Sequence, residues 1–176
     1  MESTTQNPKT SDAELTYRAP TAADGATVWE LAQASRALDL NSPYAYVMWC
    51  DRFRDSSVVA EAGGRVVGFV CGFRPPDAPE ALFVWQVAVS DDQRGRGVAG
   101  KMLRALVRRD ASIRYVEATV TPSNAASQSL FRSLATRLDC PCAETPRYDA
   151  SLFPGPSHEP ETLFRIGPFE TPQPEM

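Results

Sequence analysis

The chain alternates short runs of β-branched and aromatic residues with longer segments in which apolar residues recur at helical spacing. The short runs predict strands, and the Gly63-Gly64 turn predicts that two of them form a hairpin. The apolar character of residues 82–89 predicts a strand buried on both faces. The strands expected are residues 15–18, 57–62, 65–73, 82–89 and 115–120, with a final strand near 163–166.

Four segments carry helix signals. Thr21 supplies an N-cap for a helix through about Ala37, and Ser42 before Pro43 begins a short second helix that ends at Phe53. Helices are also expected over residues 98–109 and over residues 125–138, the latter capped by Asn124. A proline-rich connection should then lead to the final strand. This order predicts an α/β fold, a mixed central β-sheet with helices on both faces.

The length of 176 residues suits one domain, which we place at residues 15–169. Residues 1–14 are polar and patternless, so we expect a disordered N-terminal lead, and residues 170–176 should form a flexible tail. The net charge of -4 argues against nucleic-acid binding, which needs a basic face. No apolar run approaches the ~20 residues of a membrane helix and no signal peptide is evident, so a cytoplasmic protein is predicted.

The four cysteines do not form a metal or disulfide pattern. Cys50 and Cys71 lie in apolar segments, where a free cysteine behaves as a small hydrophobe. Cys140-Pro-Cys142 has one intervening residue instead of two, and no second pair accompanies it. His158 is the only histidine and is expected to be structural. We therefore predict no metal site.

The segment after the strand at 82–89 carries the clearest chemical signal. An acidic turn leads into Arg94-Gly-Arg-Gly97, which opens directly into a helix. A loop of this kind directs several backbone N–H groups and the helix dipole at one point, which suits a phosphate. The spacing fits neither the Walker loop nor the dinucleotide fingerprint. A solvated basic turn is the alternative. The helix that follows bears a basic row of Lys101, Arg104 and Arg108, which is either a solvated face or a source of contacts to a further phosphate.

Arg94-Gly-Arg-Gly97-Val-Ala99 resembles the Arg-x-x-Gly-x-Ala signature of the GNAT superfamily of N-acetyltransferases, and the predicted elements from Leu15 to Phe169 match that fold. The resemblance implies acetyl-CoA as co-substrate. Strand backbone at Val87 and Val89 would polarise the thioester, and the loop would cradle the pyrophosphate. Asn124 would contact the pantetheine arm or thiol end, although a plain helix cap is the alternative. The loop residues implied are Gln93, Arg94, Gly95, Arg96, Gly97, Val98 and Ala99.

Phe131 occupies the position at which many GNAT enzymes carry a tyrosine that protonates the departing thiolate. A phenyl ring cannot donate a proton, so the resemblance implies a cofactor-site residue here without a general acid. Thiols ionise near pH ~8.5, which makes coenzyme A thiolate a tolerable leaving group.

Four further segments resemble the L-2,4-diaminobutyrate acetyltransferase family of ectoine biosynthesis. They are residues 38–46, 83–89, 118–127 and 158–166. This resemblance implies acetyl transfer to the side-chain (N4) amine of diaminobutyrate, and a homodimer. The alternatives are a GNAT enzyme for a protein N-terminus or an antibiotic, and an acetyl-CoA-binding module without catalysis.

A small molecule with two ammonium groups and a carboxylate needs acidic, aromatic and polar partners. We take Asp39 as an ammonium anchor, Tyr44 as a substrate contact, Trp85 as a wall for cation–π contact, and Glu161 as substrate ligand and general base. Each choice has a plainer alternative. Asp39 could cap a turn, Trp85 could belong to the core, and Glu161 could be a solvated strand-edge residue.

Overall fold

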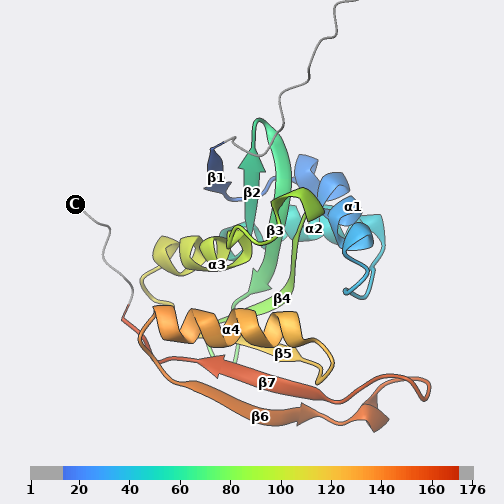
Figure 1. Ribbon diagram of the computed structural model, residues 1–176, viewed down its shortest axis with the longest axis vertical. Helices are drawn as coiled ribbons and strands as arrows, with labels where there is room; N and C mark the ends of the chain where they lie inside the picture. The colour runs from blue at the N-terminus through green and yellow to red at the C-terminus, as the bar shows by residue number, and fades with distance from the viewer. Residues whose placement is uncertain (1–13, 171–176) are drawn as a thin grey trace, which may run out of the picture.

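The computed structural model describes residues 14–170, which form a seven-stranded sheet in the order β1-β2-β3-β4-β5-β7-β6 (Figure 1). Within the sheet, β4 and β5 are parallel, whereas the other neighbouring strands run antiparallel. The strands are β1 (Leu15–Arg18), β2 (Val58–Ala62), β3 (Arg65–Phe73), β4 (Ala81–Val89), β5 (Tyr115–Val120), β6 (Cys142–Tyr148) and β7 (Glu161–Ile166).

Helices cover both faces of the sheet, as predicted. They are α1 (Gly25–Ser35), α2 (Pro43–Arg52), α3 (Val98–Arg109) and α4 (Ala125–Arg137). In Figure 1, α3 and α4 lie side by side across one face, and α1 and α2 lie at the other. Two apolar clusters follow from this arrangement. The larger includes Met102 and Leu134, and the smaller includes Val28 and Tyr46. The mixed α/β architecture is confirmed.

Most predicted boundaries agree with the structure to within two residues. The first helix differs, because its start is a 3-10 turn, η2 (Ala22–Asp24), and because it ends at Ser35. Arg36 follows with a φ of 55°, in the left-handed region that stops a helix. The predictions of a disordered lead over residues 1–14 and a flexible tail over 170–176 lie outside the described residues, apart from Glu14 and Glu170.

The predicted proline-rich connection between the last helix and the last strand is wrong. Residues 142–148 form β6, an edge strand that pairs only with β7. Proline lacks an N–H, and an edge strand is where Pro146 can be tolerated. The register also shifts between Pro146 and Tyr148. Since every β6 residue after Cys142 is exposed, the strand has no apolar alternation by which to recognise it.

The prediction that the strand at 82–89 is buried on both faces is also wrong. In β4, buried residues alternate with half-buried ones, and the last part of the strand borders a cleft instead of a neighbouring strand. Its two faces belong to different clusters, since Val84 packs with the α3 side and Trp85 with the α1 side.

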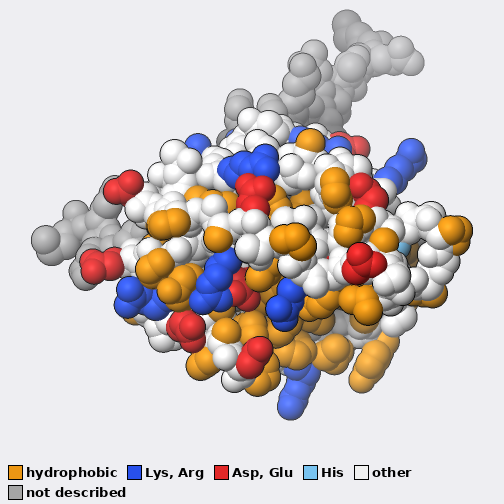
Figure 2. All heavy atoms as spheres, turned by 90° about the horizontal axis from the view of Figure 1, so that it is seen from below, with side chains coloured by type: hydrophobic (Ala, Val, Ile, Leu, Met, Phe, Trp, Pro, Cys, Tyr) orange, Lys and Arg blue, Asp and Glu red, His pale blue; other side chains and the backbone are white. Residues whose placement is uncertain are grey.

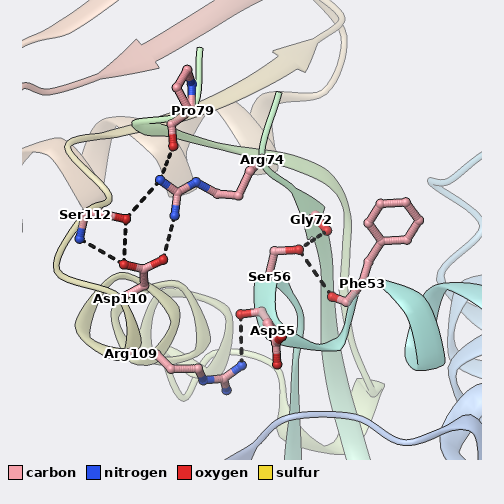
Figure 3. Close-up of polar contacts among 9 residues, drawn as sticks. All are labelled: Phe53, Asp55, Ser56, Gly72, Arg74, Pro79, Arg109, Asp110 and Ser112. Carbon is pink, nitrogen blue, oxygen red and sulfur yellow. Dashed lines mark hydrogen bonds and ion pairs between the residues drawn. The ribbon is translucent and has the colours of Figure 1, made fainter. Parts of the chain in front are cut away.

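Polar contacts fix the C-terminal end of α3 (Figure 3). Arg74, just after β3, donates to the Asp110 carboxylate at 2.7 Å and to the Ser112 hydroxyl at 3.2 Å. From α3 itself, Arg109 donates to the Ser57 carbonyl at 2.7 Å. These contacts tie the helix to the strand ends beneath it. Because α3 is held at this end, its N-terminus is presented at a defined place at the other.

Asp24 provides a test of how β1 is attached to the first helix. Arg18 contacts its carboxylate at 2.8 Å, and the Thr21 N–H donates to it at 2.7 Å. The hydrogen bond from Arg18 is the main cause that lowers the pKa of Asp24 to about 2. This carboxyl therefore stabilises the fold fully above the ordinary carboxyl pKa of ~4, and the contribution is lost as the pH falls towards 2.

We expect Asp24→Asn to lower the free energy of unfolding at pH 7 by roughly 1–2 kcal/mol, allowing for solvent screening around Arg18. The deficit should shrink as the pH is lowered from 5 to 3, as measured by urea denaturation. Asp51→Asn, on an exposed α2 residue with no ion pair in the described chain, is the control and should change stability little. A deficit that is independent of pH would contradict this account.

Candidate active site

The cleft begins where β4 and β5 part. The two strands pair only over Ala81–Phe83 and Tyr115–Glu117, so residues 84–89 have β3 as their sole strand neighbour. A cavity of about 920 Å³ opens between β4, the loop and first turns of α3, one side of α4 and the end of α1. The N–H and C=O groups on the open edge of β4 are therefore unpaired within the sheet and border this cavity.

A β-bulge at Trp85 changes how β4 faces the cleft. Cys71 pairs with Gln86 and Gly72 with Val84, which leaves Trp85 as the extra residue. The bulge reverses the alternation of faces. Before it, even-numbered Val84 packs with the α3 cluster, whereas after it odd-numbered Val87 and Val89 do so. Val87 and Val89 consequently line the cleft.

The glycine- and arginine-rich loop takes the form expected for an anion site. Gly95 and Gly97 have φ angles of 76° and 70°, which glycine adopts without strain, and Gly97 is the N-cap of α3. Beneath the loop lies Gln93, fully buried, whose side-chain oxygen accepts from Arg96. The loop backbone and the positive end of α3 therefore face the cleft together.

The charge of this part of the cleft is entirely positive. Five cationic side chains line it, and no carboxylate does: Arg94, Arg96, Lys101, Arg104 and Arg137. Within residues 14–170, only Arg94 among them has a carboxylate partner, Asp91 at 3.0 Å. Cations without carboxylate partners around a helix N-terminus suit a ligand with several phosphates. Of the basic row predicted on α3, Lys101 and Arg104 face the cleft, whereas Arg108 is not among its lining residues.

The structure brings almost all the residues predicted for cofactor binding to this cleft. Its lining includes Val87, Val89, Gln93, Arg94, Gly95, Arg96, Gly97, Val98, Ala99 and Asn124. Phe131 is the exception, because it is buried in the core beside Phe164, with ring centroids 6.3 Å apart. Phe131 does not line the cleft, so its role in cofactor binding stays a prediction.

Asn124 combines the two roles considered from the sequence. Its side-chain oxygen accepts from the Ser127 N–H at 3.1 Å and so caps α4. The residue also lines the cleft, and its amide nitrogen has no hydrogen-bond partner among the described residues. An asparagine can use its oxygen for the cap and keep its NH₂ group for a ligand.

Acidic residues gather in a second region, at the start of β7. Glu161 is half-buried, and burial is the main cause that raises its pKa. The charge of Asp39, in the connection between α1 and α2, raises that pKa further, whereas His158 and the Thr119 hydroxyl lower it. Two predicted site residues from distant parts of the sequence, Asp39 and Glu161, thus lie within electrostatic reach of each other.

The segment before Glu161 is fixed by contacts from two sides. Glu159 accepts from the Ser123 N–H at 3.2 Å and from its hydroxyl, which ties the segment to the turn beside Asn124. The ring of His158 stacks on Phe153 at 3.6 Å, and its Nδ1 lies 2.6 Å from the Glu159 carbonyl. These contacts hold the His158 ring in place, and its structural role stays a prediction.

The two aromatic candidates differ in their surroundings. Trp85 stacks on Trp49 with ring centroids 4.3 Å apart and remains half-buried, so its ring is packed and keeps some exposed surface. Its role as a wall for the substrate stays a prediction. Tyr44, in the first turn of α2, is 75% exposed. No described contact holds Tyr44 against Asp39, Trp85 or Glu161. Nor does any described contact join Trp85 to Asp39 or Glu161, and none of the four substrate candidates is among the residues that line the cavity.

Sequence reasoning missed Gln86 and Tyr46. Gln86 is a polar residue inside an apolar strand and is 5% exposed. The Tyr46 hydroxyl donates to the Gln86 side chain at 2.9 Å. A single glutamine in a run of valines was the available signal, because buried amides require partners.

Comparison with known proteins places the chain in a family. The model of the acetyltransferase (GNAT) family matches residues 26–135. The L-2,4-diaminobutyric acid acetyltransferase of Halalkalibacterium halodurans is 49% identical over 93% of this chain and 87% of its own. That of Virgibacillus pantothenticus is 50% identical over 85% of this chain and 95% of its own.

A solved structure agrees with this result. It is the diaminobutyrate acetyltransferase of Paenibacillus lautus in complex with its substrate L-2,4-diaminobutyric acid and coenzyme A. Its fold superposes with a TM-score of 0.84, at 47% identity, over 89% of this chain and 96% of that chain. Three findings lead to one conclusion: the cleft between β4 and β5, its anion-binding loop, and the agreement of sequence and fold with these relatives along the domain. The chain belongs to the L-2,4-diaminobutyric acid acetyltransferase family of the GNAT acetyltransferases.

Proposed function

We infer that this protein transfers the acetyl group of acetyl-CoA to the side-chain amine of L-2,4-diaminobutyrate, giving N4-acetyl-L-2,4-diaminobutyrate. One observation carries the inference. A structure 47% identical to this chain, with a TM-score of 0.84, holds both diaminobutyric acid and coenzyme A. The cleft has a cationic anion-binding loop, which suits coenzyme A, and the separate pair of acidic residues, Asp39 and Glu161, suits a substrate with ammonium groups.

For the cofactor, we propose the all-cationic end of the cleft as the phosphate site. The loop from Gln93 to Ala99 would hold the pyrophosphate through backbone N–H groups and the dipole of α3. The NH₂ group of Asn124 would bind the pantetheine arm. When bound, acetyl-CoA supplies an acetyl group activated as a thioester. The described residues contain no cluster of potential metal ligands.

The acceptor amine must lose a proton before it can attack a thioester, since alkyl ammonium groups have a pKa near ~10. We propose Glu161 as the group that takes this proton, directly or through a water. Burial raises the pKa of Glu161, which makes its carboxylate a stronger base than a solvated glutamate. Thr119 and His158 lie near enough to lower the pKa of Glu161 in part.

The negative charge that develops on the carbonyl oxygen needs hydrogen-bond donors. We propose that backbone N–H groups on the open edge of β4 at Val87 and Val89 provide them. They line the cleft and belong to the part of β4 without a β5 partner. With phenylalanine at position 131 and buried, no protonating residue is proposed for the departing thiolate.

We propose that Asp39 holds an ammonium group of the substrate and that Trp85 forms one wall of the pocket. The influence of Asp39 on the pKa of Glu161 supports a shared site. The half-buried Trp85 ring, held by Trp49, is a rigid surface for cation–π contact. Tyr44 is retained as a weaker candidate, because it is largely exposed.

We further propose a cytoplasmic homodimer that serves ectoine biosynthesis and osmoadaptation, as the family resemblance implies. Figure 2 looks onto the β6 side, where hydrophobic side chains gather between charged ones. Tyr148, the last residue of β6, is 39% exposed, and Leu152, shortly after it in the chain, is 67% exposed. An unpaired edge strand with such neighbours suits a subunit contact. No helix among residues 14–170 is long and apolar enough to span a membrane. Light scattering coupled to gel filtration tests the dimer.

The first test of function is release of coenzyme A thiol with a panel of amines. We expect strong preference for L-2,4-diaminobutyrate over ornithine, lysine, a peptide N-terminus and an aminoglycoside, with NMR mapping of the acetyl group to N4. Release with a different amine would overturn the substrate. Cofactor binding without release on any amine would instead support a non-catalytic module.

Replacing the proposed base should remove one limb of the pH profile. We expect Glu161→Gln to lower kcat about 10²–10⁴-fold, the usual contribution of general-base catalysis. In the wild type, kcat/KM should fall with decreasing pH around a pKa above that of an ordinary glutamate, because burial raises the pKa of Glu161. Glu30→Gln, at an exposed α1 residue with no ion pair among residues 14–170, is the matched control. An acidic limb that survives in Glu161→Gln would exclude Glu161 as the base.

Asp39 offers a test of the shared acidic site. Its negative charge raises the pKa of Glu161, so Asp39→Asn should move the acidic limb of kcat/KM to lower pH. The same variant should raise KM for diaminobutyrate, because an ammonium partner is lost. Both effects are read from one set of pH-dependent kinetics. An unchanged limb together with an unchanged KM would place Asp39 outside the site.

Alanine substitutions at two glycines of similar backbone conformation distinguish an effect on cofactor binding from an effect on stability. Gly97 (φ +70°) is at the anion loop and Gly64 (φ +77°) is in the β2–β3 turn, and a Cβ would meet nothing within 4 Å at either. Alanine at either position should therefore cost about 1 kcal/mol of stability through backbone strain. Only Gly97→Ala should raise KM for acetyl-CoA, by roughly tenfold for a loss of about 1.4 kcal/mol in binding. Equal kinetic effects in both variants would refute the proposed role of the loop.

A further inference from the structure

A buried polar contact joins the middle of β4 to residues 36–42, here termed the α1–α2 loop. The Gln86 side chain donates through Nε2 to the Asp39 carbonyl at 2.8 Å. Its Oε1 accepts from the Tyr46 hydroxyl at 2.9 Å. The Asn41 N–H in turn donates to that hydroxyl at 3.4 Å. One glutamine and one tyrosine thus hold the loop at two points.

Both side chains are inside the protein. Tyr46 is fully buried and Gln86 is 5% exposed. Burying an amide and a hydroxyl is unfavourable unless both are hydrogen-bonded, and an apolar pair of the same size would pack here without that requirement. The polar pair differs from an apolar pair in forming directional hydrogen bonds to the α1–α2 loop, through Gln86 Nε2 and the Tyr46 hydroxyl.

The loop has little else to fix its backbone. Leu38–Asn41 form no backbone–backbone hydrogen bond with any described residue. Besides the pair, Trp29 Nε1 donates to the Asn41 carbonyl at 3.2 Å, and Asn41 Nδ2 to the Asp39 carbonyl at 3.3 Å. The position of Asp39 therefore depends strongly on the contact from Gln86.

This loop contributes to both ligand regions. Leu38 lines the cleft beside Val87 and Ala88. Asp39 is the proposed ammonium anchor and lies within electrostatic reach of Glu161. Gln86 itself follows the bulged Trp85, so the strand irregularity that shapes the cleft also aims the glutamine at the loop.

We propose that Gln86 and Tyr46 are positioning residues that set the place of Asp39 and thereby the affinity for the diamine. The proposal rests on the function inferred above. Neither side chain takes part in the acyl transfer. Their loss should therefore weaken binding of the amine while leaving the cofactor site unchanged.

The test uses two variants with graded losses. Tyr46→Phe keeps the ring contacts with Phe69 and Trp85 and removes only the hydroxyl. Gln86→Met keeps the volume of the side chain and removes both of its hydrogen bonds. We expect KM for diaminobutyrate to rise roughly 5- to 50-fold, and more in Gln86→Met, from the usual effect of leaving buried polar partners unsatisfied. KM for acetyl-CoA and kcat should both stay within about twofold of the wild-type values, since the anion-binding loop of residues 93–99 and the backbone of β4 are unchanged.

Ser56→Ala is the matched control. It removes hydrogen bonds to the Phe53 and Gly72 carbonyls, and among the described residues Ser56 forms no hydrogen bond with the α1–α2 loop (Figure 3). Its effect on stability, measured by thermal denaturation, allows general destabilisation to be subtracted. The control should leave KM for the diamine unchanged.

Hydrogen exchange provides a readout that does not require turnover. Exchange of the amides at 37–41 should quicken in Tyr46→Phe and Gln86→Met but not in Ser56→Ala. Unchanged exchange, or a KM for diaminobutyrate equal to that of the control, overturns the positioning role even if the wild type is active. Absence of wild-type turnover with diaminobutyrate overturns instead the proposed function, and with it the effect on diamine affinity.

Discussion

The separation of β4 from β5 is the feature on which the rest of the structure depends. If β4 and β5 paired along their whole length, the backbone N–H and C=O groups of residues 84–89 would form hydrogen bonds with β5. Here pairing stops after three residues on each strand. The helices support both sides of the opening, since α3 packs on β2, β3 and β4 while α4 packs on β6 and β7. The two halves of the molecule are thus each covered by a helix, and contacts between α3 and α4 hold them together. The unsatisfied backbone is confined to the place where a ligand can use it.

The distribution of charge in the molecule suits the two ligands proposed for it. Cations without carboxylate partners are kept near the N-terminus of α3, and carboxylates are kept near the start of β7. Had the two sets been mixed, they would have formed ion pairs with one another and lost their capacity for phosphates and ammonium groups. Elsewhere in the molecule arginines do form such pairs, as Arg132 does with Glu144 at 2.7 Å.

The sequence allowed prediction of those features that are local. The loop from Gln93 to Ala99 and the helix after it are contiguous, so their residues and their chemistry could be recognised together. The same holds for helix starts such as Ser42-Pro43, where the side chain accepts from the Ala45 N–H. Features that depend on distant neighbours were not predictable from the pattern. The β6 strand is defined by its pairing with β7, the bulge at Trp85 by the register with β3, and the end of β4–β5 pairing by the register between those two strands. The proximity of Asp39 and Glu161 belongs to this second group, and only the family resemblance suggested a common site for them.

If Asp39 and Glu161 share one diamine, as proposed, the two carboxylates must divide their roles. A carboxylate beside an ammonium group stabilises its charged form, which raises the pKa of the amine and opposes attack on the thioester. Asp39 as an anchor is therefore useful only on the ammonium that remains charged, which is the α-ammonium. The side-chain nitrogen must lose its proton, and the proposed acceptor, Glu161, has its own pKa raised mainly by burial. In the protein without substrate, the charge of Asp39 raises that pKa further. On these roles, selection of the N4 nitrogen is a consequence of where Asp39 is held, and the α1–α2 loop that carries Asp39 is held by Gln86 on the same strand that lines the cleft.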